Sequence, residues 1–116
     1  MSRSMTEREE RIARNETLFR EVNERIRDVP PEGPAPEQSG FLCECGDAAC
    51  TETIMLTIGE YEVVRSDPAT FAVLPAHVAE DVEDVVARTD DRFVIVRKHP
   101  EGASIAIETD PRSTNS

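Results

Sequence analysis

The sequence is poor in the large residues that usually build a core, with no tryptophan, one tyrosine and four phenylalanines. Hydrophobic residues make up 38% of its 116 positions, which is lean for a globular domain but too many for a wholly disordered chain. This length has room for one small domain and an appendage. We therefore expect a domain that needs a source of stability besides its apolar core.

Long apolar runs are also missing. None approaches the roughly 20 residues that cross a bilayer. The charged N-terminal segment is not followed by the apolar region of a signal peptide. These absences predict a cytoplasmic protein that does not bind membranes.

Catalytic signatures are absent as well. The chain has no Gly-rich phosphate loop, nucleophile elbow or H-E-x-x-H helix. Its many carboxylates, among them Asp81, Glu83 and Asp84, have the spacing of solvated strand ends and turns. We therefore expect that the protein is not an enzyme.

Positive charge is scarce and unevenly placed. The formal net charge is −11, and Lys98 is the only lysine. Residues 1–27 carry seven arginines and six glutamates, whereas the rest of the chain carries six basic and 18 acidic residues. So acidic a surface repels phosphate backbones, which argues against nucleic acid and favours a protein partner with a basic surface.

Cysteine is rare but concentrated. All three cysteines lie in the run Cys43-Glu-Cys45-Gly-Asp-Ala-Ala-Cys50. An odd number of clustered thiols in a reducing compartment favours a metal over disulfides. Thiolates two positions apart can chelate one ion where the backbone turns sharply, and Gly46 supplies conformational freedom there. The run therefore predicts three metal ligands.

A tetrahedral Zn2+ site needs a fourth ligand, which His77, His99, a carboxylate or water could provide. We favour His77, because Pro75-Ala-His77 forms a turn after a strand that can pack beside the cysteine loop. Three cysteines and one histidine would close the site, which indicates structural zinc that helps a small domain to fold.

Other interpretations of the cysteines stay open. Cys43 and Cys45 could be a metal-free redox pair, although a disulfide across one residue is strained. The three cysteines and a histidine could hold an iron–sulfur cluster. A hydrolytic zinc would need His77 to be free and a base such as Glu44 to face the metal.

One amphipathic helix is predicted over residues 6–27, since Thr6 and Glu9 have capping-box spacing and no glycine or proline interrupts the segment. Its apolar residues form a narrow stripe with Asn15 in the seam. The stripe could pack on the chain's own domain, on a second copy in a homodimer, or on another protein. The candidate partner-binding residues are Ile12, Phe19, Val22 and Ile26.

The remaining segments predict an α+β fold. Residues 28–40 contain four prolines and two glycines and indicate a flexible Pro-rich linker between the helix of residues 1–27 and a zinc-stabilised domain at 41–111. A disordered tail is expected at 112–116. Within the domain we expect strands at 51–56 and 71–74, a short helix opened by the capping box of Thr57 and Glu60, a β-hairpin of 82–88 with 92–98, and a last segment at 103–109 that favours helix over edge strand.

The cysteine spacing resembles the post-SET zinc segment of SET-domain methyltransferases, in which three such cysteines and a distant residue bind zinc. This resemblance covers eight residues, and the chain is too short for a SET domain, so no methyltransferase activity is implied. It implies only that the spacing suits tetrahedral zinc.

A second resemblance covers most of the chain. The helix segment from Arg14 to Ile26, the Phe41-x-Cys-Glu-Cys motif and the Pro75-Ala-His77 turn resemble the shared marks of a family of small actinobacterial proteins. No activity is attached to that family. The resemblance favours His77 as the fourth ligand and suggests that the particular sequence of the helix is important.

The sequence thus predicts a non-enzymatic zinc-binding protein. Its N-terminal helix and acidic domain would act as a protein-interaction or regulatory module. The alternative is a thiol/zinc redox or metal sensor.

Overall fold

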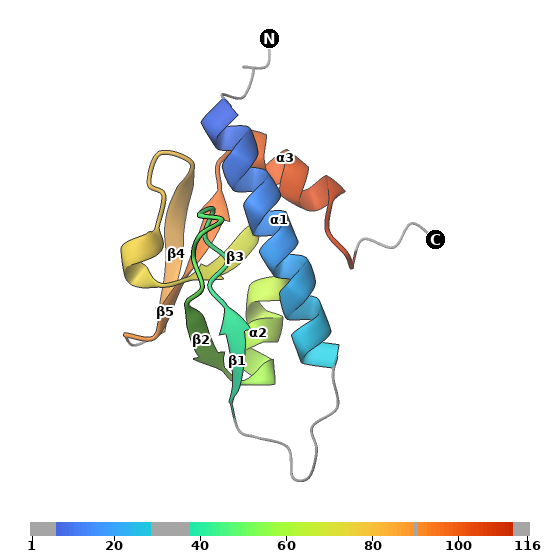
Figure 1. Ribbon diagram of the computed structural model, residues 1–116, viewed down its shortest axis with the longest axis vertical. Helices are drawn as coiled ribbons and strands as arrows, with labels where there is room; N and C mark the ends of the chain where they lie inside the picture. Colours follow the sequence, from blue (N-terminus) through green and yellow to red (C-terminus); the bar gives the residue numbers. More distant parts are fainter. Residues whose placement is uncertain (1–6, 29–37, 90, 113–116) are drawn as a thin grey trace.

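The computed structural model describes residues 7–28, 38–89 and 91–112, and shows a mixed α+β fold (Figure 1). Among these residues, no helix has both the length and the apolar character needed to cross a membrane. The elements follow in the order α1 (Glu7–Asp28), β1 (Ser39–Leu42), β2 (Thr53–Leu56), α2 (Ile58–Arg65), β3 (Thr70–Val73), a 3-10 turn (Pro75–His77), β4 (Glu83–Thr89), β5 (Phe93–Lys98) and α3 (Pro100–Glu108).

The strands form two antiparallel sheets. Strand β1 pairs with β2, so that Phe41 lies opposite Ile54. The second sheet has the order β3-β5-β4, with the predicted hairpin of β4 and β5 inside it. The register of this hairpin shifts between Val85 and Ala87. Such a bulge twists the edge strand β4 and hinders its pairing with another chain.

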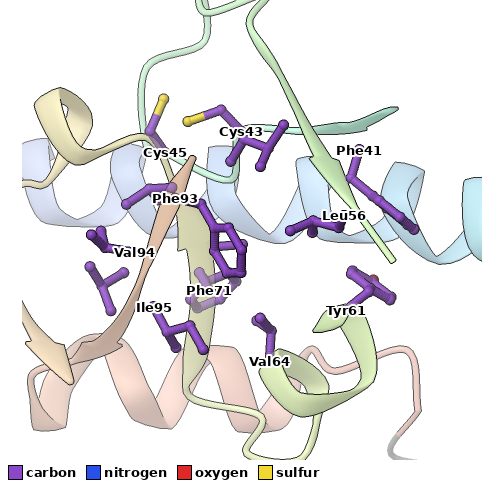
Figure 2. Close-up of a cluster of buried hydrophobic side chains, with 14 of the residues drawn as sticks. Phe41, Cys43, Cys45, Leu56, Tyr61, Val64, Phe71, Phe93, Val94 and Ile95 are labelled. Atoms are coloured by element: carbon purple, nitrogen blue, oxygen red, sulfur yellow. The ribbon is translucent and has the colours of Figure 1, made fainter. Parts of the chain in front are cut away.

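Apolar side chains from both sheets and α2 form one core (Figure 2). The rings of Phe41 and Tyr61 stack with their centroids 4.5 Å apart, which joins β1 to α2. Cys43 and Cys45 belong to the same buried cluster and lie at its edge in this view. The cysteine loop is therefore part of the wall of the core.

Helix α1 packs on the rest of the chain through polar as well as apolar side chains. Arg20 is completely buried, and its two terminal nitrogens donate to the carbonyl oxygens of Pro68 and Ala106, each at 2.7 Å. These bonds join the helix to the segment before β3 and to α3. The buried residues of α1 are Ile12, Ala13, Glu16, Arg20 and Asn23.

The predicted apolar stripe of α1 is only partly exposed. Ile12 retains 7% of its accessible surface, and Ile26 packs against the core. Phe19 and Val22 are half-buried. Of the three arrangements that the sequence left open, the structure has the helix docked on its own domain.

Local signals placed several elements correctly. Thr57 and Glu60 form both hydrogen bonds of the capping box at the start of α2. The last segment is the helix α3, which begins at Pro100, where proline costs no intrahelical hydrogen bond.

One strand lies where linker was predicted. Strand β1 begins at Ser39, inside residues 28–40, because pairing with β2 overrides the weak strand preference of Ser39 and Gly40. Thr6, residues 29–37, Asp90 and residues 113–116 lie outside the described part of the chain. The predicted cap of the first helix, most of the predicted linker and most of the predicted tail therefore remain predictions.

Candidate metal centre

Three cysteines and one histidine meet at one end of the β1–β2 pair. The candidate ligand atoms of Cys43, Cys45, Cys50 and His77 all lie within 4.8 Å of one another. The Nδ1 atom of His77 is 3.5 Å from the sulfur of Cys43 and 3.6 Å from that of Cys50. His77 therefore presents Nδ1 to the thiols.

The cysteine loop is shaped by the strands at its two ends. The Cys43 amide donates to the Glu52 carbonyl at 3.0 Å, which continues the β1–β2 ladder by one step. Inside the loop, the carbonyl and carboxylate of Asp47 accept from the amides of Cys50 and Ala49. This Asx-type turn returns the chain so that Cys50 faces the first two cysteines.

His77 reaches the cluster from the turn that follows β3. Pro75 opens this 3-10 turn, and the His77 amide donates to the Leu74 carbonyl at 2.8 Å. The Leu74 amide in turn donates to the sulfur of Cys43 at 3.3 Å. The end of β3 thus lies against the cysteine loop and brings the histidine with it.

Each thiol also receives a backbone N–H group. The donors are the amides of Leu74 to Cys43, Asp47 to Cys45 and Glu52 to Cys50. Amides that point at a sulfur favour the thiolate over the thiol. Donors of this kind commonly surround cysteine ligands and orient them.

The three thiols differ in acidity. A hydrogen bond from Cys43 lowers the pKa of Cys45 to about 5, while the same bond and burial raise the pKa of Cys43. Burial raises the pKa of Cys50. Cys45 is thus the most acidic of the three thiols, and the thiolate is the form that binds a metal.

The geometry fits a tetrahedral ion. Zinc bonds of roughly 2.3 Å to sulfur and 2.0–2.1 Å to nitrogen place a sulfur and a nitrogen about 3.6 Å apart. The distances from Nδ1 of His77 to Cys43 and Cys50 match this value. Two sulfurs on such a zinc lie about 3.8 Å apart, so donor atoms separated by up to 4.8 Å would move closer to hold one metal ion.

Glu44, between the first two cysteines, does not face the cluster. Its side chain is fully buried, and its two oxygens accept from the Ala72 amide and from Nδ2 of Asn23, each at 3.0 Å. The Glu44 amide donates to the Ala72 carbonyl at 2.8 Å. Burial raises the pKa of Glu44, which these hydrogen bonds oppose. Glu44 therefore hydrogen-bonds to the edge strand β3 through its backbone and its side chain, and connects this strand to α1 through Asn23.

Gly46 is required for space. A Cβ atom at this position would lie 2.3 Å from the Cγ2 atom of Ile12 on α1. Its φ angle lies outside the left-handed range, so the conformational freedom predicted from the sequence is not what this position uses. Close approach of the loop to the helix is the physical reason for this glycine.

A cleft of about 630 Å³ opens beside the cluster, between the first half of α1 and the cysteine loop. Cys45 and His77 form part of its wall, and Arg8 and Arg11 line its helix side. Arg8 is paired with Asp81. Of these two candidate ligands, His77 is half-buried, whereas Cys45 retains 3% of its accessible surface.

His99 lies apart from the cluster. Its Nε2 atom is 3.2 Å from a carboxylate oxygen of Asp84, and the residue precedes α3. The described residues that converge as candidate ligands include His77 and not His99.

The contacts of Asn23 with the cysteine loop were not predicted from the sequence. Its side chain accepts from the Leu42 amide at 2.7 Å and donates to the Leu42 carbonyl and to Glu44, each at 3.0 Å. Asparagine is a poor helix former. Two asparagines, Asn15 and Asn23, inside an uninterrupted helix were therefore a signal for side chain contacts with another segment.

No known protein family, no curated protein and no solved structure matches this chain. The resemblance to a family of small actinobacterial proteins stays a prediction.

Proposed function

We propose that this protein is a non-catalytic zinc-binding protein in which Cys43, Cys45, Cys50 and His77 hold one structural Zn2+. The observation that carries the proposal is the convergence of three sulfurs and one imidazole nitrogen within 4.8 Å. Zinc in such a site stabilises a small domain directly, because the ligands come together only when the chain folds.

The donor set favours zinc over other metals. Thiolates select soft ions, whereas magnesium and calcium prefer oxygen ligands. Four donor atoms within 4.8 Å of one another are close enough to bind a single ion. An iron–sulfur cluster contains several irons, so its ligands would have to lie further apart.

A structural role is favoured over catalysis. Four protein ligands leave no position for a reactive water. Glu44, the base considered from the sequence, has both oxygens engaged by Ala72 and Asn23. A metal-bound water would therefore have neither a coordination site nor that base.

For the zinc-bound fold we propose protein binding rather than nucleic-acid or membrane binding. The net charge of −11 supports a basic partner surface. A homodimer through the apolar stripe is less well supported, since Ile12 and Ile26 pack inside the chain. The exposed flank of α1, with Leu18 at 55% exposure, is the part of the helix that a partner would meet.

Elemental analysis of the purified full chain tests the zinc site. We expect one zinc per chain in the wild type and in the matched control His99→Ala, and weakened zinc binding in His77→Ala. Absence of zinc after refolding with excess Zn2+ would rule out the site. Equal zinc affinity in both histidine variants would exclude His77 as a ligand.

A redox sensor is the second candidate, favoured by the half-buried position of Cys50 and the cleft at Cys45 and His77. Hydrogen peroxide would take two electrons from two thiolates and two protons from solvent, giving one disulfide and two water molecules. Loss of the two thiolate ligands would release the zinc. We expect parallel loss of zinc and ellipticity on mild oxidation if this is the function, and reversal by a thiol reductant with Zn2+. Zinc that stays bound in millimolar peroxide contradicts it.

A further inference from the structure

Residues 43–46 alternate between the candidate metal centre and helix α1. Cys43 and Cys45 turn toward His77, whereas Glu44 and Gly46 contact the helix. The alternation has the period of an extended chain, in which neighbouring residues face opposite sides. One short segment thus has a metal-binding side and a helix-binding side.

The contact through Glu44 is buried on both partners. Asn23 on α1 and Glu44 retain 1% and 0% of their accessible surface, and Nδ2 of Asn23 donates to Oε2 of Glu44 at 3.0 Å. Asn23 also binds both backbone polar groups of Leu42, the residue before Cys43. A buried carboxylate that loses its donor is costly, so this geometry tolerates little displacement.

The contact through Gly46 is equally restrictive. Nδ2 of Asn15 donates to the Gly46 carbonyl at 2.7 Å, and the side chain of Ile12 fills the space where a Cβ atom would be. The helix therefore holds both neighbours of Cys45, Glu44 through its side chain and Gly46 through its backbone.

We propose that metal binding and docking of α1 are coupled through residues 43–46, so that the helix acts as a regulatory element of the metal centre. The inference rests on the proposed zinc site. Both events require the same conformation of this segment, and coupling between two binding events is reciprocal. A protein that captures α1 away from the domain would lower zinc affinity, and loss of zinc would loosen α1.

The coupling can be measured in the full chain with a chromophoric chelator that competes for Zn2+. Asn23→Ala removes the bonds to Leu42 and Glu44 without touching a metal ligand, and we expect about 10-fold weaker zinc binding, the range found for supporting residues of metal sites. Glu21→Ala is the matched control. It lies on the same helix, but its side chain is exposed. We expect it to leave zinc affinity within about twofold.

The outcomes separate this inference from the zinc site itself. A wild type without zinc refutes the zinc site, and the coupling with it. Normal zinc binding in the wild type and in Asn23→Ala overturns the coupling alone. Equal weakening in Asn23→Ala and Glu21→Ala also overturns it, because zinc affinity would then respond to any substitution in α1. If circular dichroism shows that Asn23→Ala does not fold with zinc, Asn15→Ala replaces it, since it removes a single bond to Gly46.

Discussion

The carboxylate of Glu16 on α1 lies 2.9 Å from the ammonium of Lys98 on β5, and both side chains are at most 2% exposed. Lys98 is the only lysine of the chain and also contacts Glu83 of β4 at 3.2 Å. Two carboxylates thus share one ammonium in the interior. Desolvation raises the pKa of Glu16 well above its ordinary value, and the attraction of Lys98 only partly opposes this.

Glu16→Gln should change how stability depends on pH. When folding raises the pKa of a carboxyl group, its contribution is present below the unfolded pKa and is lost as pH rises through the folded pKa. As pH rises above the ordinary carboxyl range, we therefore expect the wild type to lose stability relative to Glu16→Gln. A tenfold change in proton affinity corresponds to about 1.4 kcal/mol in the free energy of unfolding. Urea unfolding in the presence of saturating Zn2+ resolves a difference of this size.

Glu21→Gln, which removes an exposed carboxylate from the same helix, is the matched control for this series. A difference between the wild type and Glu16→Gln that stays constant across the pH range would show that the environment of Glu16 does not control its ionisation.

Gly46→Ala should destabilise the zinc-loaded protein by about 1–3 kcal/mol, the usual cost of overpacking. The added methyl group would overlap the side chain of Ile12, which is part of a buried helix face and cannot move aside freely. Chemical denaturation measures the loss. Gly59→Ala in α2 is the control, because its nearest contact is 3.8 Å away and alanine favours helix there.

A double-mutant cycle tests whether Ile12 is the cause. The background of Ile12→Ala removes the Cγ2 and Cγ1 atoms that would lie 2.3 Å and 2.9 Å from the added methyl group, but keeps the Cβ atom at 2.8 Å. The cost should therefore fall only in part. An unchanged cost would show that the branched end of Ile12 is not the obstruction.

Short-range chemistry made much of this fold predictable. The capping box of Thr57 and Glu60 marks the start of α2, whereas α3 begins at Pro100, three residues before the segment that was predicted to favour helix. The charged turn near residue 90 separates the two strands of the hairpin. Such signals depend on neighbours in sequence, and a single sequence shows them.

Long-range polar contacts were not predictable in the same way. Glu16, Arg20 and Asn23 look like the solvated side of an amphipathic helix, yet they are buried against partners on other elements. A prediction from hydrophobic periodicity assumes that polar residues are exposed. It therefore assigned Phe19 and Val22 to the contact face of the helix. The four candidate ligands could be predicted because three clustered cysteines need a fourth donor to complete a tetrahedral site. The supporting role of Asn23 could not be predicted, since it depends on how the helix docks.

Removal of the metal should disturb the core beyond the cysteine loop. Tyr61 is the only tyrosine and there is no tryptophan, so near-ultraviolet circular dichroism of tyrosine reports on the stack of Phe41 and Tyr61. Phe41 lies two residues before Cys43. We expect a chelator to reduce the tyrosine signal and added Zn2+ to restore it. A signal that survives full removal of zinc would show that the core forms without the metal.

Arg20→Lys should destabilise the protein by about 1–3 kcal/mol, although the charge is kept. The planar guanidinium of Arg20 reaches the carbonyls of Pro68 and Ala106 at once and lies 4.9 Å from the ring centroid of Phe71. An ammonium group offers no such fork, so one buried carbonyl would lose its donor. Urea unfolding compares it with Arg25→Lys on the exposed face of α1, which should change stability by less than about 0.5 kcal/mol. Equal stability of the two variants would mean that the charge of Arg20, and not its geometry, holds the helix on the domain.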